Sequence, residues 1–227
     1  MFEQSLQDRL VSFMYGVYAL MSGALTVTAV TAYMVSRIPN IEATLFGSPL
    51  LITFIFLGQI GLVIALSMMI ARLTFPMALA LFFAYAVSLG VTLASIFLIY
   101  TEASIIQAFA VSAGMFGAMT IYGYITGTDL TKIGNVAIMG VWGLIIAMLV
   151  NLYFQSPQFD LFISAAGVLI FTVLTAYDTQ KIKMIGQHMM GDDEMMPKIA
   201  VIGALTLYLD FVNLFLYLLR FMGRRRD

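Results

Sequence analysis

Long stretches without a charged residue dominate the chain and predict helices that cross a membrane. About 20 apolar residues are enough to span the hydrocarbon core as a helix, whereas a charge near the middle of the bilayer is costly. Uncharged windows cover residues 10–36, 43–71, 73–101, 103–128, 133–159 and 161–177. The five prolines lie at or near the borders of these windows, where a missing backbone donor does least harm. The pattern predicts six transmembrane helices, at about residues 12–36, 50–71, 76–100, 104–126, 134–154 and 159–180.

A seventh apolar segment, at about residues 199–221, contains a carboxylate near its middle. In "LTLYLDFVNLFLYLLR", helical spacing puts Thr206, Asn213 and Tyr217 on the face of Asp210. Such a polar stripe would carry a large penalty against lipid. We therefore expect this helix to be surrounded by the others or to line a wet cavity.

Composition places the whole chain in the membrane. Of its 227 residues, 62% are hydrophobic and 10% charged, and the mean hydropathy of +0.99 lies outside the range of soluble globular domains. We expect an all-α polytopic membrane protein, with seven transmembrane helices in a single domain over residues 1–227. The net charge of −1 gives no sign of a nucleic-acid partner, and the chain has no cysteine for disulfides or thiol chemistry.

Basic residues in the predicted loops favour a cytoplasmic N-terminus. With seven crossings, the N-terminal side collects Arg9, Arg72, Lys132, Lys181, Lys183 and Lys198. The loops of the other side contain Arg37 alone, and lysine and arginine favour the cytoplasmic side. The tail "RFMGRRRD" disagrees, because seven crossings put its arginines outside. Either the tail is an exception to the rule, or the last segment dips into the membrane and returns.

A second carboxylate, Asp178, follows the sixth uncharged window in "LTAYDTQKIKM". If helices six and seven are antiparallel neighbours, contact between Asp178 and Asp210 requires the sixth helix to continue through "TQKIK". Two carboxyl groups that meet in a low-dielectric site titrate in coupled steps, and their oxygens suit a hard cation such as calcium. Simpler interpretations stay open. Asp210 could be a structural acid that is neutral or hydrogen-bonded to Asn213 and Thr206, and Asp178 an ordinary acid at the membrane boundary.

The motifs "LYLDFVNLFLYLLRFMG" and "AYDTQKIK" resemble the signature of the Bax inhibitor-1 family, also called the transmembrane Bax inhibitor motif family, and especially of its small bacterial members. The resemblance covers the last two helices in motif and the whole chain in length and number of spans. It implies two layers of three helices around a central seventh, in the inner membrane of a bacterium. It also implies that Asp178 and Asp210 form a hydrogen-bonded sensor pair, with Arg72 as a latch. Some relatives carry an acid in the second helix, where this chain has only Gln59.

The function that the resemblance implies is a pH-sensitive calcium leak gated by the aspartate pair. Asp178 and Asp210 would then be the calcium ligands, calcium would be the transported ion and not a cofactor, and protons and the lipid bilayer would be further partners. No enzymatic activity is expected. The alternatives are a membrane regulator that conducts nothing and binds a partner such as a membrane protease, and a proton-coupled transporter. An intramembrane aspartyl protease is disfavoured, because "AYD" is present without a GxGD motif.

Overall fold

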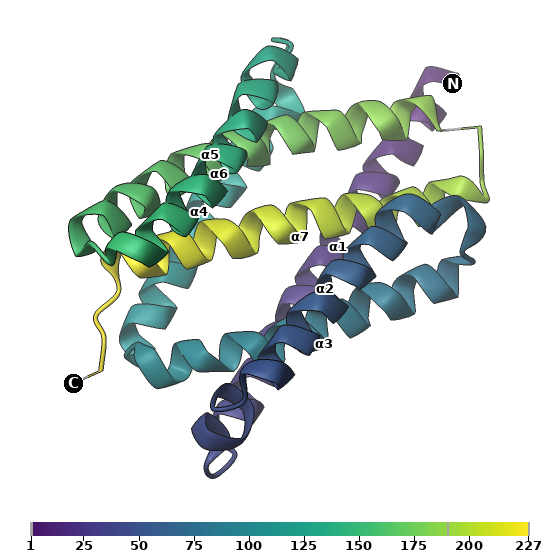
Figure 1. Cartoon of the computed structure of the whole chain (residues 1–227). Helices are drawn as coiled ribbons and strands as arrows, with labels where there is room; N and C mark the ends of the chain where they lie inside the picture. The colour runs from purple at the N-terminus through teal and green to yellow at the C-terminus, as the bar shows by residue number, and fades with distance from the viewer. Residues whose placement is uncertain (1, 190, 227) are drawn as a thin grey trace. The chain divides into compact units, whose positions relative to one another are not determined.

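The computed structural model describes residues 2–189 and 191–226, with the side chains of residues 2–5 and 46 left aside. Helices joined by short connections make up this part of the chain (Figure 1). The long helices are α1 (Phe2–Ser36), α2 (Pro49–Met69), α3 (Phe75–Ile99), α4 (Glu102–Ile125), α5 (Thr131–Phe154), α6 (Pro157–His188) and α7 (Met195–Met222). Two short helical segments flank α2, at Glu42–Phe46 and Ile70–Arg72.

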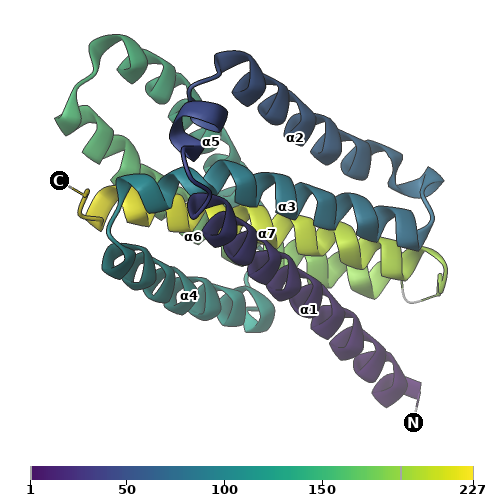
Figure 2. The same ribbon diagram turned by 90° about the horizontal axis from the view of Figure 1, so that it is seen from below.

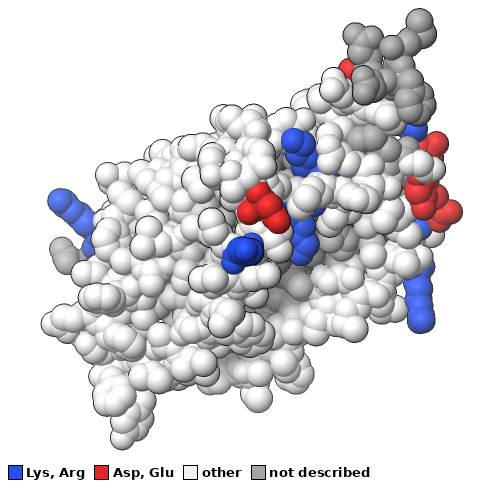
Figure 3. Space-filling model, turned by 90° about the horizontal axis from the view of Figure 1, so that it is seen from above, with Lys and Arg blue, Asp and Glu red and all other residues white. Residues whose placement is uncertain are grey.

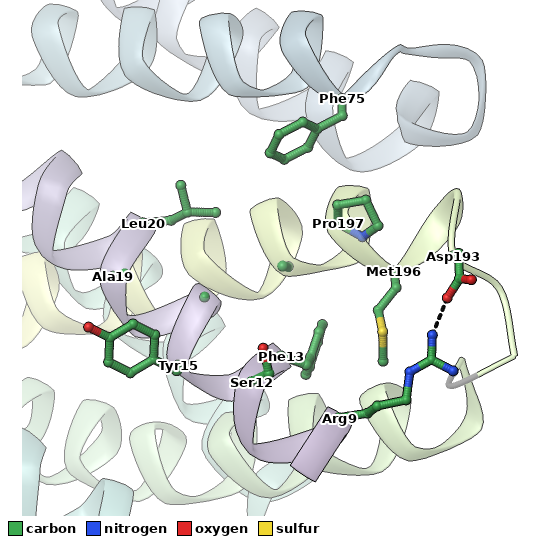
Figure 4. A pocket seen from close by; sticks show the side chains of 12 residues that line it. Arg9, Ser12, Phe13, Tyr15, Ala19, Leu20, Phe75, Asp193, Met196 and Pro197 are labelled. Atoms are coloured by element: carbon green, nitrogen blue, oxygen red, sulfur yellow. Dashed lines mark hydrogen bonds and ion pairs between the residues drawn. The ribbon is translucent and has the colours of Figure 1, made fainter. Parts of the chain in front are cut away.

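All seven long helices are apolar enough to cross a membrane, which confirms the predicted all-α polytopic class. The helices α2 and α7 have the lowest and the highest share of buried residues. In the most apolar window of α2, 11% of the residues are buried inside the protein, against 67% in α7. The exposed side chains of α2 include Leu50, Phe54 and Met68, which a bilayer accepts and water does not. Figure 3 shows a face on which most of the surface is uncharged, as lipid contact requires.

Capping residues fix the ends of several helices. Before α2, the Ser48 hydroxyl accepts a hydrogen bond from Leu51 N (3.4 Å), and Pro49 occupies the first helical position. Thr101 caps α4 in the same way, through a backbone amide three residues further on (3.3 Å). The helix α5 ends where Gln155 adopts the left-handed region with φ of 48°. Local sequence therefore stops and restarts the chain between spans.

The chain divides into two compact units, and each unit contains one half of α7. The first holds α1, α2, α3 and α7 up to Tyr208, together with the last turn of α6. The second holds α4, α5, α6 up to Met184 and α7 from Leu209. Each unit thus combines three of the first six helices with half of the seventh. The single domain and the central position of α7 stay predictions.

In the first unit, α1 and α2 both pack on α3 (Figure 2). A Cβ atom at Gly90 of α3 would lie 2.7 Å from the carbonyl oxygen of Thr28 and 2.7 Å from Thr31 Cβ, so only glycine permits this approach of α1. On the side of α2, Gln59 Nε2 donates to Thr92 Oγ1 at 2.8 Å. Gln59 therefore fastens α2 to α3.

The first half of α7 enters this unit through Tyr208, whose side chain is fully buried. Its hydroxyl lies 2.6 Å from Thr28 Oγ1, which also donates to the carbonyl of Ala86 (2.9 Å). The ring meets Phe82 and Tyr85 edge to face, with centroids 5.7 and 5.9 Å away. Side chains from α1 and α3 thus satisfy both the apolar and the polar part of Tyr208.

In the second unit, aromatic contacts hold the other half of α7. Phe211 meets Phe109 and Phe116 of α4, each with a centroid distance of 5.4 Å. One turn and a half further on, Tyr217 stacks on Phe171 of α6 at 5.7 Å. The segment of α7 that carries Asp210 is therefore packed between α4 and α6 of its own unit.

Candidate functional site

Asp178 lies in the interior of α6. The helix continues through "TQKIK" to His188, beyond residue 180, where the sixth span was predicted to end. The bounds of the membrane spans stay predictions. The seven consecutive residues from Leu174 to Gln180 are all buried, which places protein around the full circumference of this helix. Asp178 is 9% exposed. The extension of the helix that contact with Asp210 requires is present, and Asp178 does not lie at a helix end.

Glycines bring two neighbouring helices close to this part of α6. A Cβ atom at Gly123 of α4 would collide with the backbone carbonyl of Ala176, and one at Gly134 of α5 would collide with the ring of Tyr177. Small residues permit such close helix contacts in membranes. The backbone of α6 is therefore fixed directly before Asp178.

The two predicted sensor residues meet. Asp210, on α7, is 5% exposed, and a hydrogen bond joins its carboxyl group to that of Asp178. A carboxyl group donates only when protonated, so this bond requires a proton on one of the two acids. Oδ2 of Asp210 is buried and has no hydrogen-bond partner among the described residues. Buried polar atoms almost always have partners, so this oxygen has a free capacity to accept a proton, a water or a cation.

One lysine acts on the pair from the same helix. Lys181, one turn after Asp178, is close enough to affect its carboxyl group electrostatically, and its Nζ lies 5.7 Å from the ring centroid of Tyr177. The next lysine of the helix, Lys183, contacts Tyr124 instead. It donates to the carbonyl of Tyr124 at 2.8 Å and lies over the ring of the same residue. Positive charge therefore reaches the pair chiefly through Lys181.

The other members of the predicted polar stripe do not bond to Asp210. Thr206 Oγ1 and Asn213 Nδ2 each donate to the carbonyl four residues earlier in α7, at 3.0 and 2.9 Å. The hydroxyl of Tyr217 points to Met148 Sδ of α5 (3.8 Å). Across the part of the chain that the structure describes, neither Asn213 nor Thr206 forms a hydrogen bond with Asp210. Asp178 is the partner of Asp210.

Gln180, which no sequence pattern singled out, fastens α6 to the loop between α4 and α5. Its Oε1 accepts from Leu130 N at 2.9 Å, and its Nε2 donates to the carbonyl of Thr128 at 2.8 Å. The available signal was an uncharged amide two residues after Asp178, in a segment that continues a helix. Gln180 fixes the position of the turn that carries Asp178.

The same loop holds a fully exposed carboxylate, Asp129. The side chain of Thr131, and after it the backbone N–H of Thr131 (2.9 Å), donate to Asp129 and lower its pKa from the ordinary value of 3.8. Asp129 is therefore charged at neutral pH and shapes the turn that precedes α5.

Arg72, the predicted latch, ends the short segment Ile70–Arg72 and is exposed. It belongs to the first unit, whereas Asp178 belongs to the second. The latch role stays a prediction.

Asp178 and Asp210 are the acids available to a cation at this site. Within residues 2–189 and 191–226, no group of three or more His, Cys, Asp or Glu side chains could hold a metal ion. Calcium usually takes six to eight oxygen ligands, so hydroxyl, carbonyl or water oxygens would have to complete its shell. Thr179, the neighbour of Asp178 in α6, has a buried hydroxyl without a hydrogen-bond partner among the described residues.

In the described part of the chain, seven apolar helices with a hydrogen-bonded pair of buried acids on two of them define a multi-pass membrane protein with a buried carboxyl site. The family profile described as "Inhibitor of apoptosis-promoting Bax1" matches residues 10–227. The chain belongs to the Bax inhibitor-1 family, as the motifs of the last two helices indicated.

Similar proteins occur in bacteria and in a mammal. The inner membrane protein YbhL of Escherichia coli K12 is 42% identical over 218 residues, which cover 96% of this chain and 93% of YbhL. An uncharacterised protein of Borreliella burgdorferi is 46% identical over 226 residues, 99% of this chain and 97% of that protein. Mouse protein lifeguard 4 is 31% identical over 212 residues, 93% of this chain and 84% of its own length. The likeness covers nearly the whole transmembrane region.

Proposed function

We propose that the protein is a pH-sensitive calcium leak of a bacterial inner membrane, gated by Asp178 and Asp210. The observation that carries the proposal is the buried, hydrogen-bonded carboxyl pair with one oxygen of Asp210 lacking a partner. YbhL, which is similar over nearly its whole length, is named as an inner membrane protein, and this supports the location. A cytoplasmic N-terminus and the latch role of Arg72 belong to the same proposal, which assigns no enzymatic step and no cofactor.

The gate works through the proton that the two acids share. While the proton is present, the hydrogen bond ties α6 to α7 at Asp178 and Asp210. Loss of the proton leaves two like charges in a low-dielectric site, where they repel each other and attract a cation. The two carboxyl groups titrate as one coupled system, so protons and calcium compete for the same oxygens. Lys181 moderates this competition, since it is the nearest positive charge on α6.

The test is calcium flux into dye-loaded liposomes that contain the purified protein, over about pH 6 to 8. Asp210→Asn keeps the size of the side chain and removes its titration, so the pH dependence of the flux should disappear. Asp129→Asn is the matched control. It makes the same chemical change at a fully exposed loop position and should leave the pH profile as in the wild type.

Absence of flux above that of empty liposomes at every pH would overturn the leak. A flux whose pH profile is the same in the wild type and in Asp210→Asn would overturn the carboxyl gate and retain the leak. If Asp129→Asn changed the profile as much as Asp210→Asn, the effect would come from general charge and the pair would not be the gate.

The second candidate function is a regulator that conducts nothing and binds a membrane partner, such as a membrane protease. The word "inhibitor" in the description of the family favours it. Deletion of residues 1–10, of which Met1 lies outside the described residues, distinguishes the leak from the regulator. A regulator that acts through this segment should lose its effect on the partner, whereas a leak in liposomes should persist.

A further inference from the structure

Two adjoining hollows lie in the second unit, where the turn between α5 and α6 meets the end of α7. Their volumes are ≈ 370 Å³ and ≈ 400 Å³. Both are lined by the same polar side chains, which are Asn151, Gln155, Asp160, Arg220 and Arg225. The intramembrane acids line neither hollow. We call this place the Arg225 pocket.

Positive charge exceeds negative charge in the Arg225 pocket. Arg220, in the last turn of α7, forms an ion pair with Asp160 at 3.5 Å and lies over the ring of Tyr217. Arg225 forms no ion pair with any residue that the structure describes. Two arginines and one aspartate give the lining a formal charge of +1. The pocket therefore favours an anion.

The backbone around Arg225 is held in place and is not a loose tail. Tyr100 and Arg225 form an antiparallel bridge. On either side, Thr101 N donates to the carbonyl of Arg224 (3.1 Å), and Arg224 N donates to Ser104 Oγ (2.9 Å). These bonds fasten the basic segment to the start of α4. Arg225 is thus presented to the pocket at a fixed backbone position.

The lining also supplies neutral hydrogen-bond donors. Asn151 Oδ1 accepts from Ser156 N at 3.1 Å, which leaves the Nδ2 amide of Asn151 to donate. Gln155, whose left-handed conformation closes the turn, adds a second side-chain amide. Guanidinium groups together with amide donors are the set that binds the oxygens of a phosphate group.

We propose that the Arg225 pocket binds a phosphate group. The pocket lies at the end of three spans, since α5 ends at Phe154, α6 begins at Pro157 and α7 ends at Met222. Phospholipid headgroups occupy that level of a membrane, so an anionic headgroup is one source of the phosphate, and free inorganic phosphate is the other. Binding would anchor the C-terminal arginines. It does not depend on calcium flux.

The experiment measures binding to the purified full-length protein in detergent by native mass spectrometry. The probes are phosphatidylglycerol, phosphatidylcholine and inorganic phosphate. Wild type should bind phosphatidylglycerol better than phosphatidylcholine, and Arg225→Gln should weaken this binding roughly fivefold, the loss expected for one arginine near an anionic surface. Arg224→Gln is the matched control. It removes the same charge from the neighbouring residue, whose side chain does not line the pocket.

Two further variants keep the test decisive. Asp160→Asn removes the negative charge from the lining and should tighten binding, which is a change that a misfolded variant would not produce. Arg225→Lys retains the charge and should recover part of the binding. If inorganic phosphate binds with the same response to Arg225→Gln and phosphatidylglycerol does not, the pocket takes free phosphate.

Three results would overturn the proposal. The first is binding of phosphatidylglycerol that Arg225→Gln leaves unchanged, with no binding of inorganic phosphate. The second is an equal loss in Arg224→Gln and Arg225→Gln, which would assign the effect to the net charge of the tail. The third is weaker binding in Asp160→Asn.

Discussion

Two buried polar groups lie two residues apart in α7, and their surroundings differ. The hydroxyl of Tyr208 lies 2.6 Å from Thr28 Oγ1, which donates to the carbonyl of Ala86, so this chain of polar groups ends at a backbone acceptor. Asp210 has one hydrogen bond, to Asp178, and its Oδ2 has no partner within the described part of the chain. One group is satisfied and the other is not.

The difference supports the proposal that Tyr208 has a structural role and Asp210 a functional one. A satisfied buried hydrogen bond adds about 1 kcal/mol to stability, whereas an unsatisfied buried group costs about 1–3 kcal/mol. Tyr208 therefore stabilises the first unit. Asp210 carries a cost that packing does not explain, and an acid within a membrane span is by default the basis of a functional hypothesis. The four predictions below test this contrast.

The largest loss of stability is expected from glycine substitutions near the two polar groups, at Gly90 on the side of Tyr208 and at Gly123 on the side of Asp210. Gly90→Ala would press a methyl group against Thr28, and Gly123→Ala would press one against the carbonyl of Ala176. Each should lower the free energy of unfolding by about 1–3 kcal/mol, measured by denaturant titration in detergent. Gly123→Ala alone should also alter the pH dependence of calcium flux, because Ala176 lies two residues before Asp178.

The control for both glycine variants is Gly117→Ala, also in α4, where an added Cβ atom would meet nothing within 4 Å. It should leave stability unchanged or raise it slightly, since alanine favours a helix. Wild-type stability of Gly123→Ala would contradict the close contact between α4 and α6.

A smaller loss of stability is expected from a substitution at Tyr208, whose hydroxyl has a hydrogen-bond partner. Tyr208→Phe removes one hydroxyl and leaves Thr28 bonded to Ala86, so unfolding should become easier by about 1 kcal/mol. A double-mutant cycle with Thr28→Val measures the coupling between the two hydroxyls. The pH profile of calcium flux should stay as in the wild type. A changed profile would mean that the functional region extends into the first unit.

A substitution at Asp210, whose Oδ2 has no partner among the described residues, should hardly change the stability. The amide of Asp210→Asn can donate to Asp178 without the shared proton, so the free energy of unfolding should stay within about 0.5 kcal/mol of the wild type. Asp178→Asn should behave in the same way, because its amide can likewise donate to Asp210 without the shared proton. Loss of stability as large as that of Tyr208→Phe, with an unchanged pH profile of flux, would show that Asp210 is a structural acid.

The sequence predicted the helices and left open how far the sixth helix continues. Counting charges treats Asp178 and Lys183 as markers of the membrane border. In the structure Asp178 bonds to Asp210, and Lys183 donates to the carbonyl of Tyr124, so partners from other helices allow polar residues to continue a buried helix. These partners are far away in sequence. Helical spacing also suggested that Asn213 would hold Asp210, but its amide reaches the carbonyl four residues earlier, a local bond that competes with any partner across helices.

The Arg225 pocket could not be predicted either. The basic tail looked like an exception to the orientation rule, and its role as a pocket wall depends on the bridge between Tyr100 and Arg225. No periodic pattern of hydrophobic residues predicts a contact between the start of the fourth helix and the residues that follow the seventh.

The smallest effect is expected at Asp129, in the loop that Gln180 holds. Hydrogen bonds from the side chain and then the backbone of Thr131 lower the pKa of Asp129 in the folded protein. A lowered pKa adds stability above the ordinary value of 3.8, and this stability is lost as the pH falls through the folded value. Asp129→Asn does not titrate, so its unfolding free energy should fall less steeply on acidification, with little change at neutral pH. Equal acid slopes in wild type and variant, measured by denaturant titration, would show that the bonds from Thr131 do not hold Asp129 in its charged form.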